Sequence, residues 1–166
     1  MSAVSRGRLA LVAVGAALLL GGYNASIYQK ERLLARGTVV RLALAPRDPR
    51  ALLTGDYMAL NFALAREAAA AAGRGGPADL FAIVSVDERR VARLLRVQQR
   101  PTPLAAGELV LRLRVRRDGP RLGTDAFYFR EGDARRYEPA RFGEFRVDAG
   151  GEMLLTQLLG AQLEPL

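Results

Sequence analysis

The stretch ELVLRLRVR, residues 108–116, decides the fold class of this 166-residue chain. Leucine or valine stands at every odd position from Leu109 to Val115, and arginine stands at every even position from Arg112 to Arg116. A period of two is typical of a half-buried β-strand, because successive side chains of a strand point to opposite faces. The stretch therefore predicts a strand with its apolar side chains in a core and its arginines in solvent.

Segments on both sides of this strand repeat the pattern. Apolar alternation or β-rich composition predicts strands at 38–45, 57–64, 80–86, 91–97, 126–130, 142–147 and 153–159. Residues 87–90 and 148–151 read as hairpin turns and 117–123 as a further turn, while 153–159 also fits a helix face. The alanine-rich run LAREAAAAAG, residues 64–73, predicts one short helix. Because strands and helices do not alternate regularly, we expect a mainly β, β-rich α+β fold with antiparallel strands.

The N-terminal region has a different composition. Residues 9–28, LALVAVGAALLLGGYNASIY, contain no charged side chain and would span roughly 30 Å as a helix, enough to cross a bilayer. A cleaved signal peptide would need a small-residue cleavage site, and a buried helix would normally be amphipathic. The run has neither feature, so we favour an uncleaved signal anchor in residues 1–30, a β-rich domain in residues 31–166, and contact of Leu9–Tyr28 with lipid.

Composition excludes several kinds of chemistry. The chain has no cysteine and no histidine, and Lys30 is its only lysine. Disulfides, thiol nucleophiles, imidazole-ligated zinc and histidine-dependent triads are therefore absent, and we expect no metal or cofactor. The 25 basic and 17 acidic residues give a net charge of +8. Because the basic residues follow no nucleic-acid-binding motif, we expect no nucleic-acid partner.

The orientation of the anchor follows from the positive-inside rule. Arg6 and Arg8 precede the apolar run, which favours a cytoplasmic N-terminus and an extracytoplasmic C-terminal domain. Lys30, Arg32 and Arg36 follow the run and weaken this difference. The short N-terminal tail is nevertheless easily retained, so we expect a single-pass protein with its β-rich domain outside the cytoplasm.

One segment has a more specific signature. Residues 46–62 read PRDPRALLTGDYMALNF, and they resemble the GDYXXLXY family of membrane-anchored bacterial proteins of unknown activity. The motif maps onto Gly55, Asp56, Tyr57, Leu60 and Phe62, with Phe in place of the final Tyr. The upstream Asp48-Pro49-Arg50 and the tail segment 128–151 also belong to the resemblance. It implies a bacterial inner-membrane location and, because members are often encoded beside a multi-spanning membrane protein, a partner of that kind.

The motif has a structural and a functional interpretation. In the first, Gly55 and Asp56 form a turn, Tyr57 begins an outward face, and Leu60 and Phe62 enter the core. In the second, Asp56 and Tyr57 line a surface groove with Arg50 as electrostatic partner. The aromatic tail offers a further candidate interface, since aromatic and arginine side chains are enriched at binding surfaces. Its residues are Tyr128, Phe129, Glu131, Tyr137 and Phe142.

Three other functions are alternatives to a non-catalytic interaction domain, and each would require particular residues. An envelope hydrolase would use Asp56 with a tail carboxylate such as Glu131, and a ligand-binding module would have a pocket lined by the tail aromatics. A signal peptidase would need a serine with a lysine base. Ser26 and Lys30 share that spacing only at the membrane exit, so this third function is disfavoured. We therefore expect the chain to be a binding protein and not an enzyme.

Overall fold

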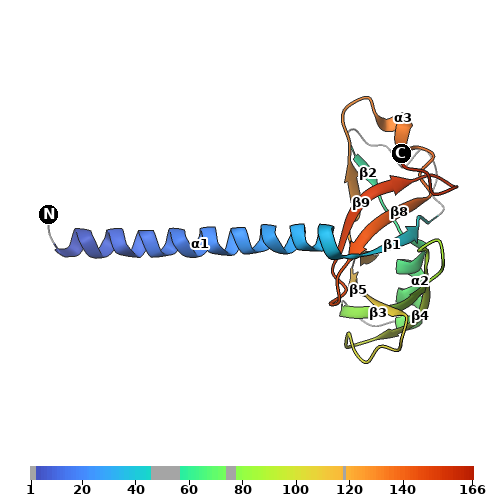
Figure 1. The fold of residues 1–166 in the computed structure, drawn as a ribbon, viewed down its shortest axis with the longest axis horizontal. Coiled ribbons are helices and arrows are strands. Elements are labelled where there is room, and N and C mark those ends of the chain that lie inside the picture. The colour runs from blue at the N-terminus through green and yellow to red at the C-terminus, as the bar shows by residue number, and fades with distance from the viewer. Residues whose placement is uncertain (1–2, 46–56, 74–77, 118) are drawn as a thin grey trace.

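The structure is a computed structural model that describes residues 3–45, 57–73, 78–117 and 119–166. A long N-terminal helix, α1 (Ala3–Arg36), leads into a β-rich domain, which lies across its end in Figure 1. The predicted fold class, one N-terminal apolar helix followed by an antiparallel β-rich domain, is confirmed, and all pairs of named strands are antiparallel. Arg50, Gly55 and Asp56 lie outside the described residues.

The described residues of the domain form three β-sheets. A three-stranded sheet has the order β1 (Thr38–Ala43), β8 (Phe142–Val147), β9 (Met153–Leu159). A four-stranded sheet has the order β4 (Ala92–Gln98), β3 (Ala78–Val86), β5 (Glu108–Arg116), β6 (Gly119–Leu122). A two-stranded ribbon pairs β2 (Tyr57–Ala59) with β7 (Ala126–Tyr128). In Figure 1 this ribbon and the short helix α3 (Ala134–Tyr137) lie at one end of the domain, and the β3–β4 hairpin lies at the other.

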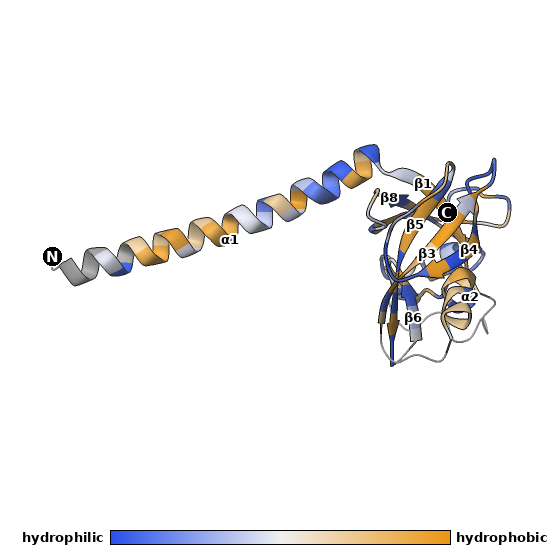
Figure 2. Cartoon of the chain, turned by 90° about the horizontal axis from the view of Figure 1, so that it is seen from below, coloured by the Kyte–Doolittle hydropathy of each residue, from blue (hydrophilic) through white to orange (hydrophobic). Residues whose placement is uncertain are grey.

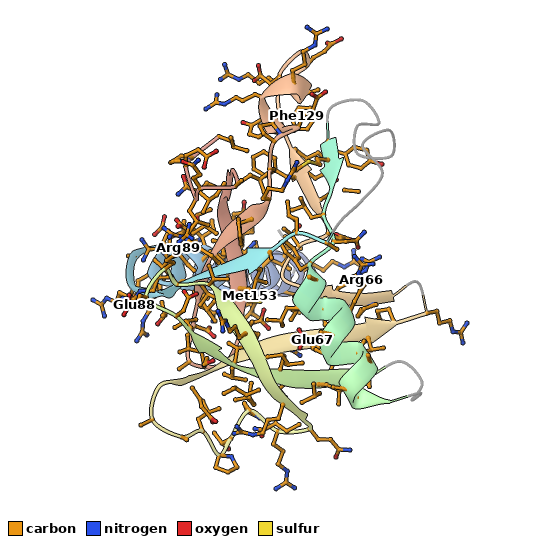
Figure 3. The ribbon with its side chains drawn as sticks, turned by 90° about the vertical axis from the view of Figure 1, so that its right-hand side faces the viewer. Arg66, Glu67, Glu88, Arg89, Phe129 and Met153 are labelled. Carbon is orange, nitrogen blue, oxygen red and sulfur yellow. The ribbon has the colours of Figure 1, made fainter. Side chains whose placement is uncertain are left out.

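The core forms where these sheets meet helix α2 (Ala63–Ala72). One side of α2 supplies the buried Leu64, Ala65 and Ala68, and the helix contacts β4, β5, β6 and β1. Figure 3 shows α2 covering one face of the four-stranded sheet. The largest fully buried side chains are Phe145, Leu42, Met58, Ile83, Leu111, Leu113, Leu122, Leu158 and Leu159. Of the inward residues predicted for 108–116, Leu111 and Leu113 are core residues, and Leu109 and Val115 are partly buried against the core.

The arginines of β5 lie on the opposite face, as expected, and make ion pairs with acidic side chains. Arg116 contacts Asp79 of β3 at 2.7 Å, and Arg112 and Arg114 both contact Glu152. These side chains are 40–45% exposed to solvent, so each ion pair contributes little to stability. These ion pairs place the arginines of β5 beside acidic side chains of neighbouring segments on the polar outer face.

Helix α1 is exposed along its apolar part. Every residue from Ala10 to Arg32 is exposed, and within the described chain only the end of α1 contacts β8 and β9. Figure 2 shows that the helix changes from apolar to hydrophilic before it reaches the domain. It is long and apolar enough to cross a membrane, and a signal sequence has the same character. The interpretation as a buried helix is therefore excluded, while anchor and signal sequence both fit.

Several predicted boundaries were wrong. The strand expected at 57–64 ends at Ala59, and Leu64 already belongs to α2, which starts at Ala63. Residues 119–122, expected in a turn, form the edge strand β6, where Pro120 is tolerated because an edge strand leaves some N–H positions unpaired. The strand predicted at 153–159 is confirmed as β9, and the alternative of a helix there is wrong. The helix α3 was not predicted.

Candidate functional site

The described half of the GDYXXLXY motif has a surface residue followed by core residues. Tyr57 begins β2 and is 38% exposed, whereas Leu60 and Phe62 are buried. The Phe62 ring contacts the Phe145 ring edge-to-face, with 5.2 Å between centroids. The Leu60 N–H donates to the Asp125 carbonyl at 2.7 Å, which continues the β2–β7 ribbon. The structural interpretation therefore holds for Leu60 and Phe62, and Tyr57 is available for contact.

Tyr57 forms an exposed aromatic pair with Tyr128. The two residues are direct partners in the β2–β7 register, and their ring centroids are 5.8 Å apart. Tyr128 is 76% exposed. The next pair in the register, Met58 and Phe127, turns toward the core, and Met58 is fully buried. The ribbon therefore has one buried face and one face on which two tyrosines meet solvent.

The remaining tail aromatics pack mainly against one another. Phe129 stacks on Tyr137 of α3 with 5.3 Å between centroids, and Phe127 meets the same ring edge-to-face at 5.0 Å. The Arg136 guanidinium lies over the Tyr137 ring at 5.7 Å. Figure 3 shows Phe129 at the α3 end of the domain. This cluster is partly buried and contains Phe127 and Phe129, the two neighbours of Tyr128 in the sequence.

The other tail candidates lie apart from the tyrosine pair. Phe142 is a half-buried residue of β8, between Ala43 and Leu159 in the sheet register. Glu131 is exposed in the turn before α3. Among the described residues, no group of three or more acidic side chains is placed to hold a metal ion. Because Asp56 lies outside the described residues, the hydrolase hypothesis stays a prediction.

Glu144, another tail carboxylate, has a structural partner from far away in the sequence. It accepts a hydrogen bond from Arg41 Nε at 2.9 Å and another from the Gln157 amide at 2.9 Å. Arg41 also donates to the Arg89 carbonyl at 2.9 Å, which joins β1 to the turn after β3. Glu144 therefore pairs with residues of β1 and β9, the two strands that flank β8 in the sheet.

A cavity of about 480 Å³ adjoins the motif. Its walls come from the motif segment, from the start of α2, and from β6 and the residues after it. Arg66, Arg121, Thr124 and Asp125 supply polar groups, and Arg121 makes an ion pair with Asp125 at 2.6 Å. None of the predicted tail aromatics lines this cavity. The sequence pattern did not indicate these four polar residues, because it predicted a turn where the structure has β6.

The Arg96–Glu108 ion pair closes the loop between β4 and β5. Arg96 donates from two guanidinium nitrogens to the two carboxylate oxygens of Glu108, and the Ala105 N–H donates to the same carboxylate at 2.8 Å. The hydrogen bonds from Arg96, and next the one from Ala105, hold the pKa of Glu108 at about 2, below its usual 4.5. Glu108 does not line the cavity, so we assign the pair a structural role.

Replacing Glu108 with glutamine should make stability less sensitive to acid. A carboxylate with a lowered pKa in the folded state stabilises the fold above its unfolded pKa, and this stabilisation is lost as pH falls through the folded value. The unmodified chain should therefore lose more urea resistance than Glu108→Gln between about pH 4.5 and about pH 2. Glu88→Gln, in an exposed turn, is the matched control and should follow the unmodified chain. Parallel pH curves for Glu108→Gln and the unmodified chain would contradict this role.

These features define an antiparallel β-rich domain on one N-terminal helix that is long and apolar enough to cross a membrane. The chain belongs to the GDYXXLXY family, because the model of that family, described as GDYXXLXY protein, matches residues 19–158. Comparison with curated proteins finds no match, and comparison with solved structures finds none. The resemblance inferred from the motif is therefore confirmed over most of the chain.

Proposed function

We propose that this chain is a membrane-anchored, non-catalytic binding protein. Its β-rich domain would work outside the cytoplasm of a bacterial cell, and its partner would be a multi-spanning protein of the same membrane. The observation that carries the proposal is the exposed Tyr57–Tyr128 pair on a domain attached to an exposed apolar helix. Tyrosine is enriched in the centres of protein interfaces, where its ring is desolvated.

The arrangement of the domain supports a partner in the membrane. Figure 1 shows the domain extending sideways from the end of α1, with the β2–β7 ribbon away from the helix axis. If α1 spans the bilayer, this ribbon lies over the neighbouring membrane surface, where the loops of a multi-spanning protein would be. Arg130, Arg135 and Arg136 are exposed near the ribbon and add the residue type that accompanies tyrosine at interfaces.

Replacing Tyr128 with alanine should weaken the complex by about 2 kcal/mol, the usual threshold for a central interface residue. The fold should be nearly unaffected, because this side chain lies mostly in solvent. Leu95→Ala is the matched control, since Leu95 is 50% exposed on β4 at the other end of the domain. The measurement is affinity for the purified partner in detergent, with the thermal midpoint recorded for each variant.

The partner itself can be identified by photocrosslinking in cells. A photoreactive amino acid at position 128 should capture a multi-spanning membrane protein, and the same residue at position 95 should not. Mass spectrometry of the crosslinked product gives its identity. Equal or no crosslinking at the two positions would contradict an interface at the tyrosine pair.

A further inference from the structure

A groove separates the end of α1 from the β-rich domain. It has a volume of about 680 Å³, which is within the range of ordinary ligand sites. Its helical wall is formed by Gln29, Arg32, Leu33 and Arg36. These positions are spaced three and four residues apart, so they form one stripe of the helix. We call this space the junction groove.

The charge in the junction groove is positive. Arg32 and Arg36 are exposed, and among the described residues neither side chain makes a hydrogen bond or ion pair. Asp148 is the one carboxylate among the described lining residues. Its Oδ1 already accepts the N–H groups of Gly150 and Glu152, each at 2.9 Å. The groove is therefore lined by two unpaired guanidinium groups and one carboxylate that is engaged in its own turn.

The opposite wall of the groove is apolar. It is formed by Leu104 in the loop before β5, by Leu109 of β5 and by Val147 of β8. Leu104 is 37% exposed, so part of this wall meets solvent. A basic wall facing an apolar wall suits a ligand that has both an anionic group and a hydrocarbon part.

The position of the groove relative to the bilayer agrees with such a ligand. With the uncharged run ending at Tyr28, Arg32 lies about 6 Å and Arg36 about 12 Å further along the helix axis. The headgroup layer on each side of the hydrocarbon core is roughly 5–8 Å thick. Arg32 is thus at the level of lipid phosphates, and the long Arg36 side chain can extend back to them.

The groove is fixed in shape by the junction at Gly37. The Gly37 N–H donates to the Leu33 carbonyl at 2.8 Å, and the Gly37 carbonyl accepts from Arg146 Nη1 at 3.0 Å. A Cβ at this position would be 2.5 Å from the Leu33 carbonyl oxygen, so a larger residue would displace the helix. Only Gly37 therefore separates α1 from β1, and it is hydrogen-bonded both to the helix and to β8.

We propose that the junction groove binds the headgroup of an anionic glycerophospholipid from the surrounding bilayer. Arg32 and Arg36 would hold the phosphate, and Leu104 and Leu109 would cover the glycerol and upper acyl carbons. This inference rests on the proposed membrane anchoring. It adds a ligand that would orient the domain on the bilayer surface before a protein partner binds.

The test uses the full chain in phosphatidylcholine vesicles that contain a trace of photoactivatable phosphatidylglycerol. Crosslinks should map to the peptides of residues 29–36 and 104. Arg32→Gln should lower the yield about fivefold, the loss expected when one exposed guanidinium–phosphate contact is removed. Lys30→Gln is the matched control: Lys30 is at nearly the same depth but does not line the groove. It should change the yield less than twofold.

Four outcomes would overturn the inference. The first is equal labelling by a photoactivatable phosphatidylcholine, and the second is an equal loss of crosslinking yield in Lys30→Gln and Arg32→Gln. The third is labelling elsewhere on the chain. The fourth is complete loss of labelling when inorganic phosphate is added, which would show that the groove binds free phosphate. Resistance to alkaline extraction, measured on the same vesicles, separates the two proposals. An extractable chain contradicts the anchor and the groove together, whereas an inserted chain without anionic preference contradicts the groove alone.

Discussion

Replacing Phe62 with alanine should lower the free energy of unfolding by about 3–5 kcal/mol, the usual cost of removing a buried phenylalanine ring. Phe62 is 2% exposed, and its ring contacts the ring of Phe145. Its backbone forms an isolated antiparallel β-bridge with Leu44, the residue that follows β1. It also precedes α2, where its carbonyl accepts the Ala65 N–H at 3.1 Å. Since a domain of this size is stable by only about 5–15 kcal/mol, this loss would remove a large part of its stability.

The control for Phe62 comes from the same motif. Tyr57→Ala removes a ring of similar size that is 38% exposed, so we expect it to cost no more than about 1.5 kcal/mol, the upper value for an aromatic pair. Urea unfolding of the full chain in detergent, followed by tyrosine fluorescence, measures both variants. An equal cost for the two substitutions would show that the motif is not divided into a core half and a surface half.

A close approach of β8 to the Phe62 ring explains why this core position is sensitive. A Cβ on Gly143 would be 3.0 Å from the ring of Phe62 and 3.2 Å from that of Phe145. The absence of a side chain at 143 therefore lets both rings pack against the sheet. Phe62 and Gly143 are far apart in the sequence, so the motif alone does not reveal this dependence.

The parts of the fold that could be predicted are those with a local signal. The alternation of 108–116 predicted β5, and the turn 148–151 between apolar strands predicted the β8–β9 hairpin. In contrast, the alternation at 57–64 continued past Ala59, because Phe62 and Leu64 are buried for different reasons. Phe62 packs against Phe145, and Leu64 lies on the buried side of α2. Alternation alone cannot locate such a change from strand to helix.

The candidate site was predicted only in part for a similar reason. Tyr57 and Tyr128 were each identified from the sequence, one in the motif and one in the tail. Their contact depends on the β2–β7 register, which pairs strands far apart in the chain. The junction groove likewise depends on where the loop carrying Leu104 meets α1. Charge patterning identified Arg32 and Arg36 only as basic residues after the apolar run.

A single cysteine at position 131 should react with a membrane-impermeant maleimide in intact spheroplasts, and a cysteine at position 5 should react only after lysis. The chain has no cysteine of its own, so each label reports one position. Glu131 is exposed, and Ser5 precedes the apolar run. The expected difference is all-or-none, because the folded β-rich domain and position 5 are then on opposite sides of the bilayer.

This labelling also separates the two interpretations of α1. A cleaved signal sequence would remove position 5 from the mature chain, whereas an anchor keeps both positions in one full-length product. Basic residues flank both ends of the apolar run, Arg6 and Arg8 before it and Lys30, Arg32 and Arg36 after it, so the labelling tests the orientation that the short N-terminal segment favours. The reverse labelling pattern would place the β-rich domain in the cytoplasm. The tyrosine pair would then face the cytoplasmic loops of any membrane partner, and the junction groove would face the inner leaflet.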